Sequence, residues 1–146
     1  DCAPLSRPAA ALIEALGDEL HFMRDPTRGG LAATLADLAS GSGHDVEIDE
    51  ASIPVNPAAL AVAEILGLDL LTVANEGKLV AVVSADACEE ALRVLQEFPI
   101  AHEATRIGRI VPQEDIAQLP LVEMITKIGG RRIVQTPYGE ELPRIC

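Results

Sequence analysis

Segments with helical and strand-like patterns alternate along this chain of 146 residues, and this order limits the folds open to it. Helices are expected at residues 5–16, 25–40, 57–66 and 85–97, and glycines follow the first three. Strands are expected at residues 19–23, 45–49, 68–74, 78–84 and 105–111, and near 121–128 and 131–135. The segments 68–74 and 78–84 are expected to pair as a hairpin. We therefore predict an α+β fold, in which helices cover a mixed, mainly antiparallel sheet.

The core of this fold must be aliphatic. Hydrophobic residues make up 49% of the chain, whereas aromatic residues make up 2% and tryptophan is absent. Leu, Ile, Val and Ala therefore supply the buried surface, as is usual in the layered domains of soluble enzymes. A length of 146 residues is typical of one domain.

Charge and cysteine content exclude several classes of protein. A net charge of −12 repels a phosphate backbone, so we expect no nucleic-acid partner. No apolar run approaches the roughly 20 residues of a membrane span.

Three cysteines without a CxxC pair indicate neither a disulfide framework nor a zinc site, and no metal ligand is predicted. A reducing cytoplasm is expected. Because the chain starts without Met, we expect more protein upstream.

The first candidate site is Asp25-Pro26-Thr27-Arg28-Gly29-Gly30. Asp25 followed by Pro26 is a helix start signal. Two glycines in the first helical turns cost about 1 kcal/mol each relative to alanine, which indicates a close approach of the backbone. Free N–H groups would make this helix end an anion site, to which Arg28 could add charge. The alternative is an ordinary capped helix against a sheet, and the local sequence alone favours that alternative.

The second candidate site is Asn75-Glu76-Gly77-Lys78. Asn75 and Gly77 suit a tight turn. Glu76 lies between two apolar segments, and a partly desolvated carboxylate there could serve as a general base. The alternative is a solvated turn with an exposed acid, which the local sequence favours.

The third candidate is the segment 137–146, which ends at Cys146. Two prolines and a glycine predict an open tail, and a thiol at the end of a mobile tail can be presented to another protein. The position does not match a prenylation box. Cys88 lies in a helical pattern and is expected to be a buried small hydrophobe.

The stretches FMRDPTRGGLA, ANEGKL and PRIC together resemble the HypE family of nickel–iron hydrogenase maturation proteins. The resemblance covers nearly the whole chain, although residues 112–136 carry no matching motif. The DPTRGG motif also occurs, more loosely, in aminoimidazole ribonucleotide synthetase, selenophosphate synthetase and thiamine monophosphate kinase. Its combination with PRIC is specific to the HypE family.

This resemblance implies a C-terminal, synthetase-like domain at residues 1–136, partly ferredoxin-like, and a mobile tail at 137–146. It also implies an N-terminal domain, absent from this chain, which forms a homodimer and binds most of the ATP and Mg²⁺. The nucleotide- or phosphate-binding residues on this chain would be Asp25, Thr27, Arg28, Gly29 and Gly30.

The resemblance further implies a reaction. The partner HypF would transfer a carbamoyl group to Cys146, and ATP-dependent dehydration would convert it to a thiocyanate. The cyano group would then pass to iron held by a HypC–HypD complex. Catalysis would fall to Cys146 and Glu76, and further motif residues would be Asn75, Lys78, Pro143 and Arg144.

Two other functions remain open. The chain could belong to another ATP-dependent synthetase or kinase of the same superfamily that acts on a small molecule. It could also be a thiol carrier or docking module without catalysis of its own.

Overall fold

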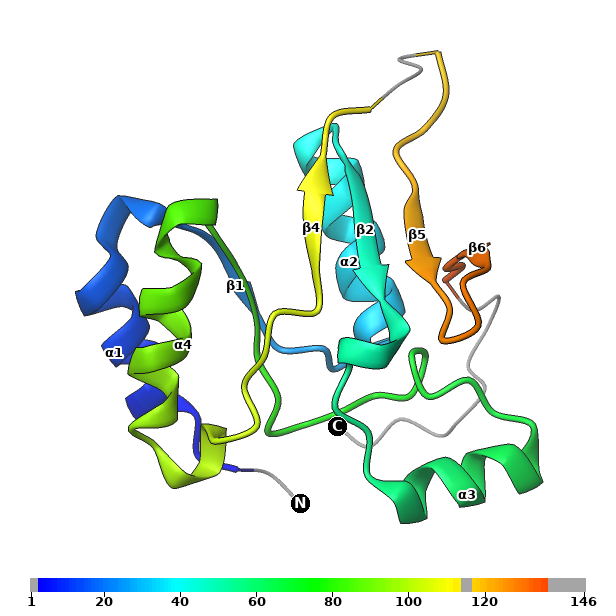
Figure 1. Ribbon diagram of the computed structural model, residues 1–146, viewed down its shortest axis with the longest axis horizontal. Helices are drawn as coiled ribbons and strands as arrows, with labels where there is room; N and C mark the ends of the chain where they lie inside the picture. The colour runs from blue at the N-terminus through cyan, green and yellow to red at the C-terminus, as the bar shows by residue number, and fades with distance from the viewer. Residues whose placement is uncertain (1–2, 114–116, 137–146) are drawn as a thin grey trace. The chain divides into compact units, whose positions relative to one another are not determined.

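A computed structural model describes residues 3–113 and 117–136 (Figure 1). The chain forms two compact units, and each unit is built from two separate stretches of sequence. The first unit contains residues 1–26 and 75–106, and the second contains residues 27–74 and 107–146. Helices and mixed, mostly antiparallel sheets confirm the α+β class. None of the helices in the described ranges is both long and apolar enough to cross a membrane.

The first unit packs two helices beside a two-stranded sheet. Its elements are α1 (Ser6–Leu16), η1 (Gly17–Glu19), β1 (Leu20–Arg24), β3 (Val80–Val83), η3 (Ala85–Ala87), α4 (Cys88–Gln96) and η4 (Pro99–Ala101). Strands β1 and β3 pair antiparallel, with Arg24 opposite Val80. Leu12 and Leu16 of α1 meet Ala91 and Val94 of α4 in an aliphatic core.

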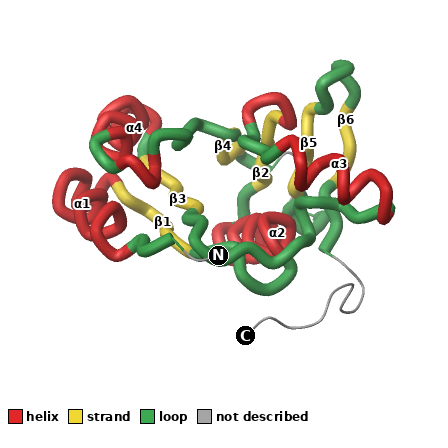
Figure 2. Tube along the Cα trace, turned by 90° about the horizontal axis from the view of Figure 1, so that it is seen from below, coloured by secondary structure: helices red, strands yellow, loops and turns green. Residues whose placement is uncertain are grey.

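The second unit is a four-stranded sheet with α2 against one face (Figure 2). Its elements are α2 (Gly30–Ser42), β2 (Asp45–Asp49), η2 (Glu50–Ser52), α3 (Pro57–Leu66), β4 (Gly108–Val111), β5 (Val122–Ile125) and β6 (Arg131–Ile133). The strand order is β4-β2-β5-β6, and only the β2–β5 pair is parallel. Val46 and Ile48 of β2 are buried together with Val122 and Met124 of β5. Alternating burial along β2 and β5 is what a sheet covered on one face requires.

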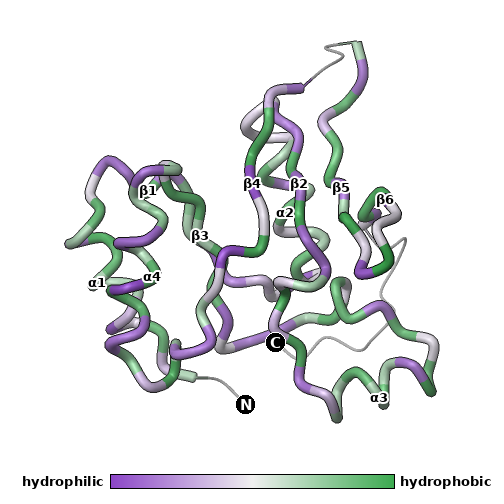
Figure 3. Tube along the Cα trace, in the orientation of Figure 1, coloured by the Kyte–Doolittle hydropathy of each residue, from purple (hydrophilic) through white to green (hydrophobic). Residues whose placement is uncertain are grey.

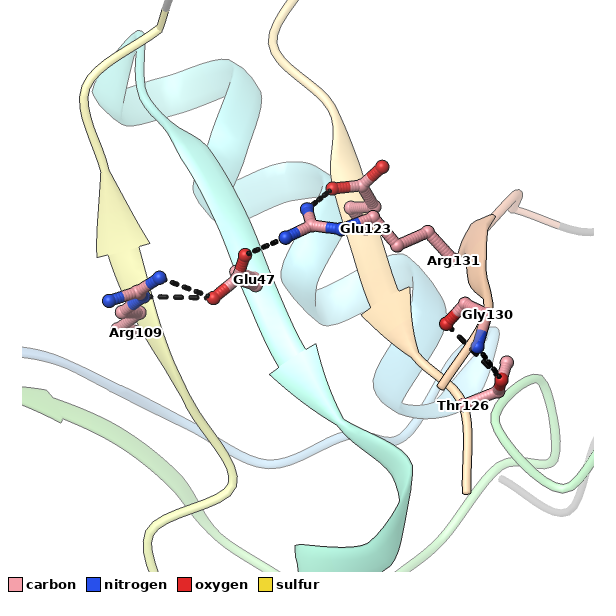
Figure 4. A network of polar contacts seen from close by, with 6 residues as sticks. All are labelled: Glu47, Arg109, Glu123, Thr126, Gly130 and Arg131. Atoms are coloured by element: carbon pink, nitrogen blue, oxygen red, sulfur yellow. Dashed lines mark hydrogen bonds and ion pairs between the residues drawn. The ribbon is translucent and has the colours of Figure 1, made fainter. Parts of the chain in front are cut away.

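Acidic and basic side chains alternate across neighbouring strands of the same sheet (Figure 4). Glu47 of β2 lies 2.7 Å from a guanidinium nitrogen of Arg109 and 3.2 Å from one of Arg131. Arg131 also pairs with Glu123, and that hydrogen bond raises the pKa of Arg131 further above its ordinary value. Both arginines are more than half exposed, so each pair adds little stability and the network mainly keeps the strands in register.

The strand predicted at residues 45–49 and the helix predicted at 57–66 are both confirmed. The hairpin predicted for 68–74 and 78–84 is wrong, because residues 69–72 form a turn and β3 pairs with β1 instead. The carboxylate of Asp69 accepts a hydrogen bond from the Leu71 amide, and the Asp69 carbonyl accepts one from the Thr72 amide. This turn, formed by a side chain onto its own backbone, prevails over the strand propensity of the apolar residues.

The predicted start of the second helix is also wrong. Asp25 and Pro26 lie in extended chain, and α2 begins at Gly30. Gly29 takes the cap position with a left-handed backbone (φ 67°), and no side chain caps the helix. Backbone contacts, described below, replace the side-chain cap that Asp25 was expected to provide.

Candidate functional site

In the first unit, two motifs far apart in sequence meet at one end of the β1–β3 pair. Arg24 is opposite Val80 at the end of the ladder. Beyond it, the Asn75 amide donates a hydrogen bond to the Pro26 carbonyl at 3.1 Å. Between these two contacts lie Asp25, on the segment that follows β1, and residues 76–79, on the segment that precedes β3. The structure therefore brings Asp25 and the segment that holds Glu76 to the same edge.

The side chains at this edge differ in exposure. Asp25, Asn75 and Lys78 are exposed, whereas Glu76 is half-buried and takes part in a polar interaction. Gly77 has a φ of 71°, so the turn expected around Asn75 and Gly77 is present. It joins residues 71–74 to β3, however, rather than two paired strands. Glu76 is half-buried, which is compatible with the partial desolvation expected of a base, but the hairpin that was expected to surround it is absent.

In the second unit, Gly29 and Gly30 begin α2 with consecutive left-handed backbones. A Cβ atom on Gly30 would lie 2.5 Å from the Leu71 carbonyl oxygen and 2.6 Å from that of Val73. A Cβ atom on Gly29 would lie 2.7 Å from the Cβ of Ala33. The close approach that the sequence predicted is therefore real, and its partner at Gly30 is the chain's own backbone.

The contact of residues 71–73 with α2 also reduces the number of free amides at the start of this helix that could bind an anion. The Ala32 amide, in the first turn of α2, donates to the Leu71 carbonyl at 2.8 Å. One of the helix's unpaired N–H groups is thus already used inside the unit. Arg28 is exposed and Thr27 is half-buried just before the helix. Any phosphate contact at this end would rely on these two residues and on the remaining amides.

Among residues 3–113 and 117–136, no group of three His, Cys, Asp or Glu side chains is arranged to hold a metal ion.

The proposed reacting thiol, Cys146, lies outside the described residues, as do Pro143 and Arg144. Cys88 is half-buried at the first residue of α4, not buried as expected. The sequence did not indicate the role of Leu71 and Val73, whose carbonyl oxygens face Gly30. Asp69, a strong turn former placed two residues earlier, was the signal that could have revealed them.

Comparison with known proteins places these motifs in a family. The model described as "AIR synthase related protein, C-terminal domain" matches residues 3–118. Carbamoyl dehydratase HypE of Rhizobium leguminosarum bv. viciae is 46% identical over all 146 residues, which cover 41% of that protein. The chain thus spans about two fifths of the length of the curated relatives it matches.

Solved structures agree with this comparison. The hydrogenase maturation protein HypE in complex with ATP is 39% identical, with a TM-score of 0.90 over 99% of this chain and 43% of that one. A HypE–HypF complex gives 35% identity and a TM-score of 0.85, over 94% of this chain and 43% of that one. Both confirm the resemblance drawn from the three motifs. The chain belongs to the AIR synthase-related protein family, as its C-terminal domain.

Proposed function

We propose that this chain is the C-terminal part of an enzyme that dehydrates a carbamoyl group bound to the thiol of Cys146. The observation that carries the proposal is the 46% identity, over all 146 residues, to a protein named carbamoyl dehydratase HypE. In this proposal an N-terminal domain binds most of the ATP and Mg²⁺ and forms a homodimer. The solved HypE–ATP complex supports ATP as the co-substrate.

The chemistry suits the residues at hand. A thiolate is the competent nucleophile and accepts the carbamoyl group as a thiocarboxamide. The amide oxygen is a poor leaving group, and transfer of the γ-phosphoryl group of ATP onto that oxygen converts it into phosphate. Removal of the nitrogen protons as phosphate departs leaves a thiocyanate, ADP and inorganic phosphate. Glu76 is the proposed base, and Asn75 and Lys78 flank it.

The proposed partners follow the same sequence of steps. HypF would supply the carbamoyl group, which the solved HypE–HypF complex supports. A HypC–HypD complex would receive the cyano group on its iron. The phosphate-contacting residues on this chain would be Thr27, Arg28 and the amides near Gly29 and Gly30, with Asp25 beside them.

Mass spectrometry tests the proposal directly. The complete protein is incubated with HypF, ATP and carbamoyl phosphate, and its peptides are mapped. We expect the carbamoyl group on the peptide that contains Cys146, followed by loss of one water in the presence of ATP. The Cys146→Ser variant should remain unmodified, and Cys88→Ser should behave as the parent. Modification at Cys2 or Cys88 would refute the assignment.

The same assay addresses the alternative of a thiol carrier without catalysis. A carrier would be carbamoylated but would not lose water in any form of the protein. Dehydration by the complete protein excludes that alternative, and its absence supports it.

A further inference from the structure

His21 and Ser84 form a polar contact in the first unit. Nε2 of His21, on β1, lies 2.8 Å from Oγ of Ser84. Strand β3 is apolar throughout, and Ser84 is the residue that follows it (Figure 3). Leu20 is opposite Val83 at this end of the β1–β3 ladder, whereas Arg24 and the candidate site lie at the other end. The contact is therefore separate from the site already described.

The backbone at His21 departs from regular strand geometry. Along the ladder, Leu20 is opposite Val83 and Phe22 is opposite Val82. His21 is thus an extra residue between two pairs whose partners on β3 are consecutive, which is a β-bulge. A bulge interrupts the ladder and redirects a side chain, and bulges are over-represented beside active sites. Here the bulge falls on the residue that carries the imidazole.

Ser84 departs from the usual role of a serine at its position. It is the N-cap of η3, which continues directly into α4. A serine there normally accepts a hydrogen bond from an amide of the first helical turn. The Ser84 side chain makes no such capping bond, and its hydroxyl contacts His21 instead. Two departures from regular local structure therefore meet at one contact, as is typical of a functional site.

The backbone holds Ser84 beside an open pocket. The Ser84 amide donates to the Glu19 carbonyl at 2.9 Å, and the Ser84 carbonyl accepts from the Ala87 amide at 3.0 Å. The pocket has a volume of about 460 Å³ and is lined by Glu19 and residues 84–87. The carboxylates of Glu19 and Asp86 are exposed and give this region negative charge, so it suits a neutral or cationic molecule better than an anion.

We propose that Ser84 is a nucleophile and His21 its general base, and that the pair accepts acyl groups from small neutral or cationic esters. A nucleophilic hydroxyl needs a base within about 2.6–3.2 Å, and the contact of 2.8 Å meets this requirement. Ser84 also lies at a strand-to-helix turn, where the amide of the next residue commonly stabilises the oxyanion. Ala85 holds that position.

The reaction would have two steps. In the tautomer that carries its proton on Nδ1, Nε2 of His21 takes the hydroxyl proton as Oγ of Ser84 attacks the carbonyl carbon of the ester. The bond from that carbon to the leaving oxygen breaks, and the alcohol departs with the proton from Nε2. In the second step Nε2 takes a proton from water, which attacks the acyl group, and Ser84 recovers its hydroxyl as the acid is released.

A fluorophosphonate tests the nucleophile, because Oγ of an activated serine attacks its phosphorus and displaces fluoride. The complete protein is incubated with this reagent, and its peptides are mapped by mass spectrometry. We expect Ser84 to be labelled about 10²–10⁴-fold faster in the folded protein than in guanidinium, the usual contribution of a general base. Ser42, whose hydroxyl donates to the Ala39 carbonyl, should gain no such factor. With p-nitrophenyl acetate, the acetyl group should appear on the Ser84 peptide.

Two variants separate base catalysis from a purely structural contact that fastens β1 to the start of the helix. His21→Gln retains a hydrogen-bonding group but cannot take the proton, so labelling of Ser84 should fall about 10²-fold or more. His44→Gln alters a histidine that bonds to a backbone carbonyl, and should label like the parent. Thermal melting of each variant verifies that it is folded.

Two results would overturn the inference. One is labelling of Ser84 that is no faster in the folded parent than in guanidinium, a comparison that needs no variant. The other is labelling that a folded His21→Gln variant leaves unchanged, which would reduce the contact to a structural role. Carbamoylation of Cys146 is read on a different peptide, so this inference and the proposed function are tested separately.

Discussion

Gly30 has two separate reasons to be glycine, a left-handed backbone and the nearness of two carbonyl oxygens. Its φ is 62°, and any Cβ atom would lie 2.5 and 2.6 Å from the oxygens of Leu71 and Val73. Both neighbours are backbone atoms that cannot rotate away. The sequence indicated that this glycine serves a close approach, and the approach is made within the fold.

We therefore predict that Gly30→Ala lowers the free energy of unfolding by about 3 kcal/mol, from backbone strain and overpacking together. Gly41→Ala, near the end of the same helix, meets nothing within 4 Å. It should be neutral or stabilising by up to about 1 kcal/mol. Urea denaturation of both variants is the measurement. A Gly30→Ala variant that keeps parental stability but loses activity would instead point to a ligand at this position.

Glu76 is half-buried at the edge where Asn75 meets Pro26. If it is the base, Glu76→Gln should slow thiocyanate formation by about 10²–10⁴-fold, the usual loss for a general base. Carbamoylation by HypF should continue at the parental rate, because that step takes place in the partner's site. Mass spectrometry distinguishes the carbamoylated protein from the thiocyanate, because their masses differ by one water.

Glu89→Gln is a suitable control, because Glu89 is an exposed acid on α4. Dehydration by Glu76→Gln at the parental rate would make Glu76 structural, and Lys78→Met would then test the neighbouring alternative.

At the scale of elements, α3 depends on its ends more than on its packing. Asn56 accepts hydrogen bonds from the amides of Ala58 and Ala59, Pro57 opens the helix, and Gly67 closes it with a φ of 69°. Ala63 alone is buried among its ten residues. Local signals in the sequence are therefore sufficient to specify this helix, which explains why its predicted bounds are correct.

We predict that Asn56→Ala removes about 1 kcal/mol of helix stability. Because little burial opposes fraying, the loss should appear as faster amide hydrogen exchange in residues 60–66, with α2 unaffected. Asn56→Ser retains an acceptor and should exchange like the parent. Unchanged exchange in the alanine variant would mean that contacts other than the cap hold α3.

Where the sequence misled, a contact with a distant segment decided the structure. Residues 68–74 are mostly apolar and include the strand formers Thr72 and Val73, but the carbonyls of Leu71 and Val73 face α2 and the Asp69 turn bends the chain after α3. Asp25 has the character of an N-cap, but the backbone around Gly29 supplies the start of α2. The approach of Gly30 to the carbonyls of Leu71 and Val73 cannot be read from local pattern, because these partners lie more than 40 positions from it. Apart from the strand expected at residues 68–74, the helix–strand order follows from local periodicity and was predicted.

At the scale of the whole molecule, the proposed function assigns most of the ATP and Mg²⁺ ligands to another domain. No metal-binding cluster occurs among residues 3–113 and 117–136, and the Ala32 amide is already bonded. We therefore expect the 146-residue chain to bind ATP weakly and to hydrolyse none. Titration calorimetry with and without Mg²⁺ is the measurement. Tight, magnesium-dependent binding to this chain would contradict the expectation that another domain supplies most ligands.

The interleaving of the two units has a consequence for how the chain is made. Leu20 pairs with Val83, and Val46 pairs with Val122, so neither sheet can close until late in synthesis. With the first unit split at residues 26 and 75, a ribosome that has released residues 1–74 has exposed half of each unit and completed neither. At about 5–20 residues per second, these apolar segments wait unpaired for several seconds. Folding dominated by such distant pairings is slow, and a cut between residues 74 and 75 leaves neither unit complete in either fragment.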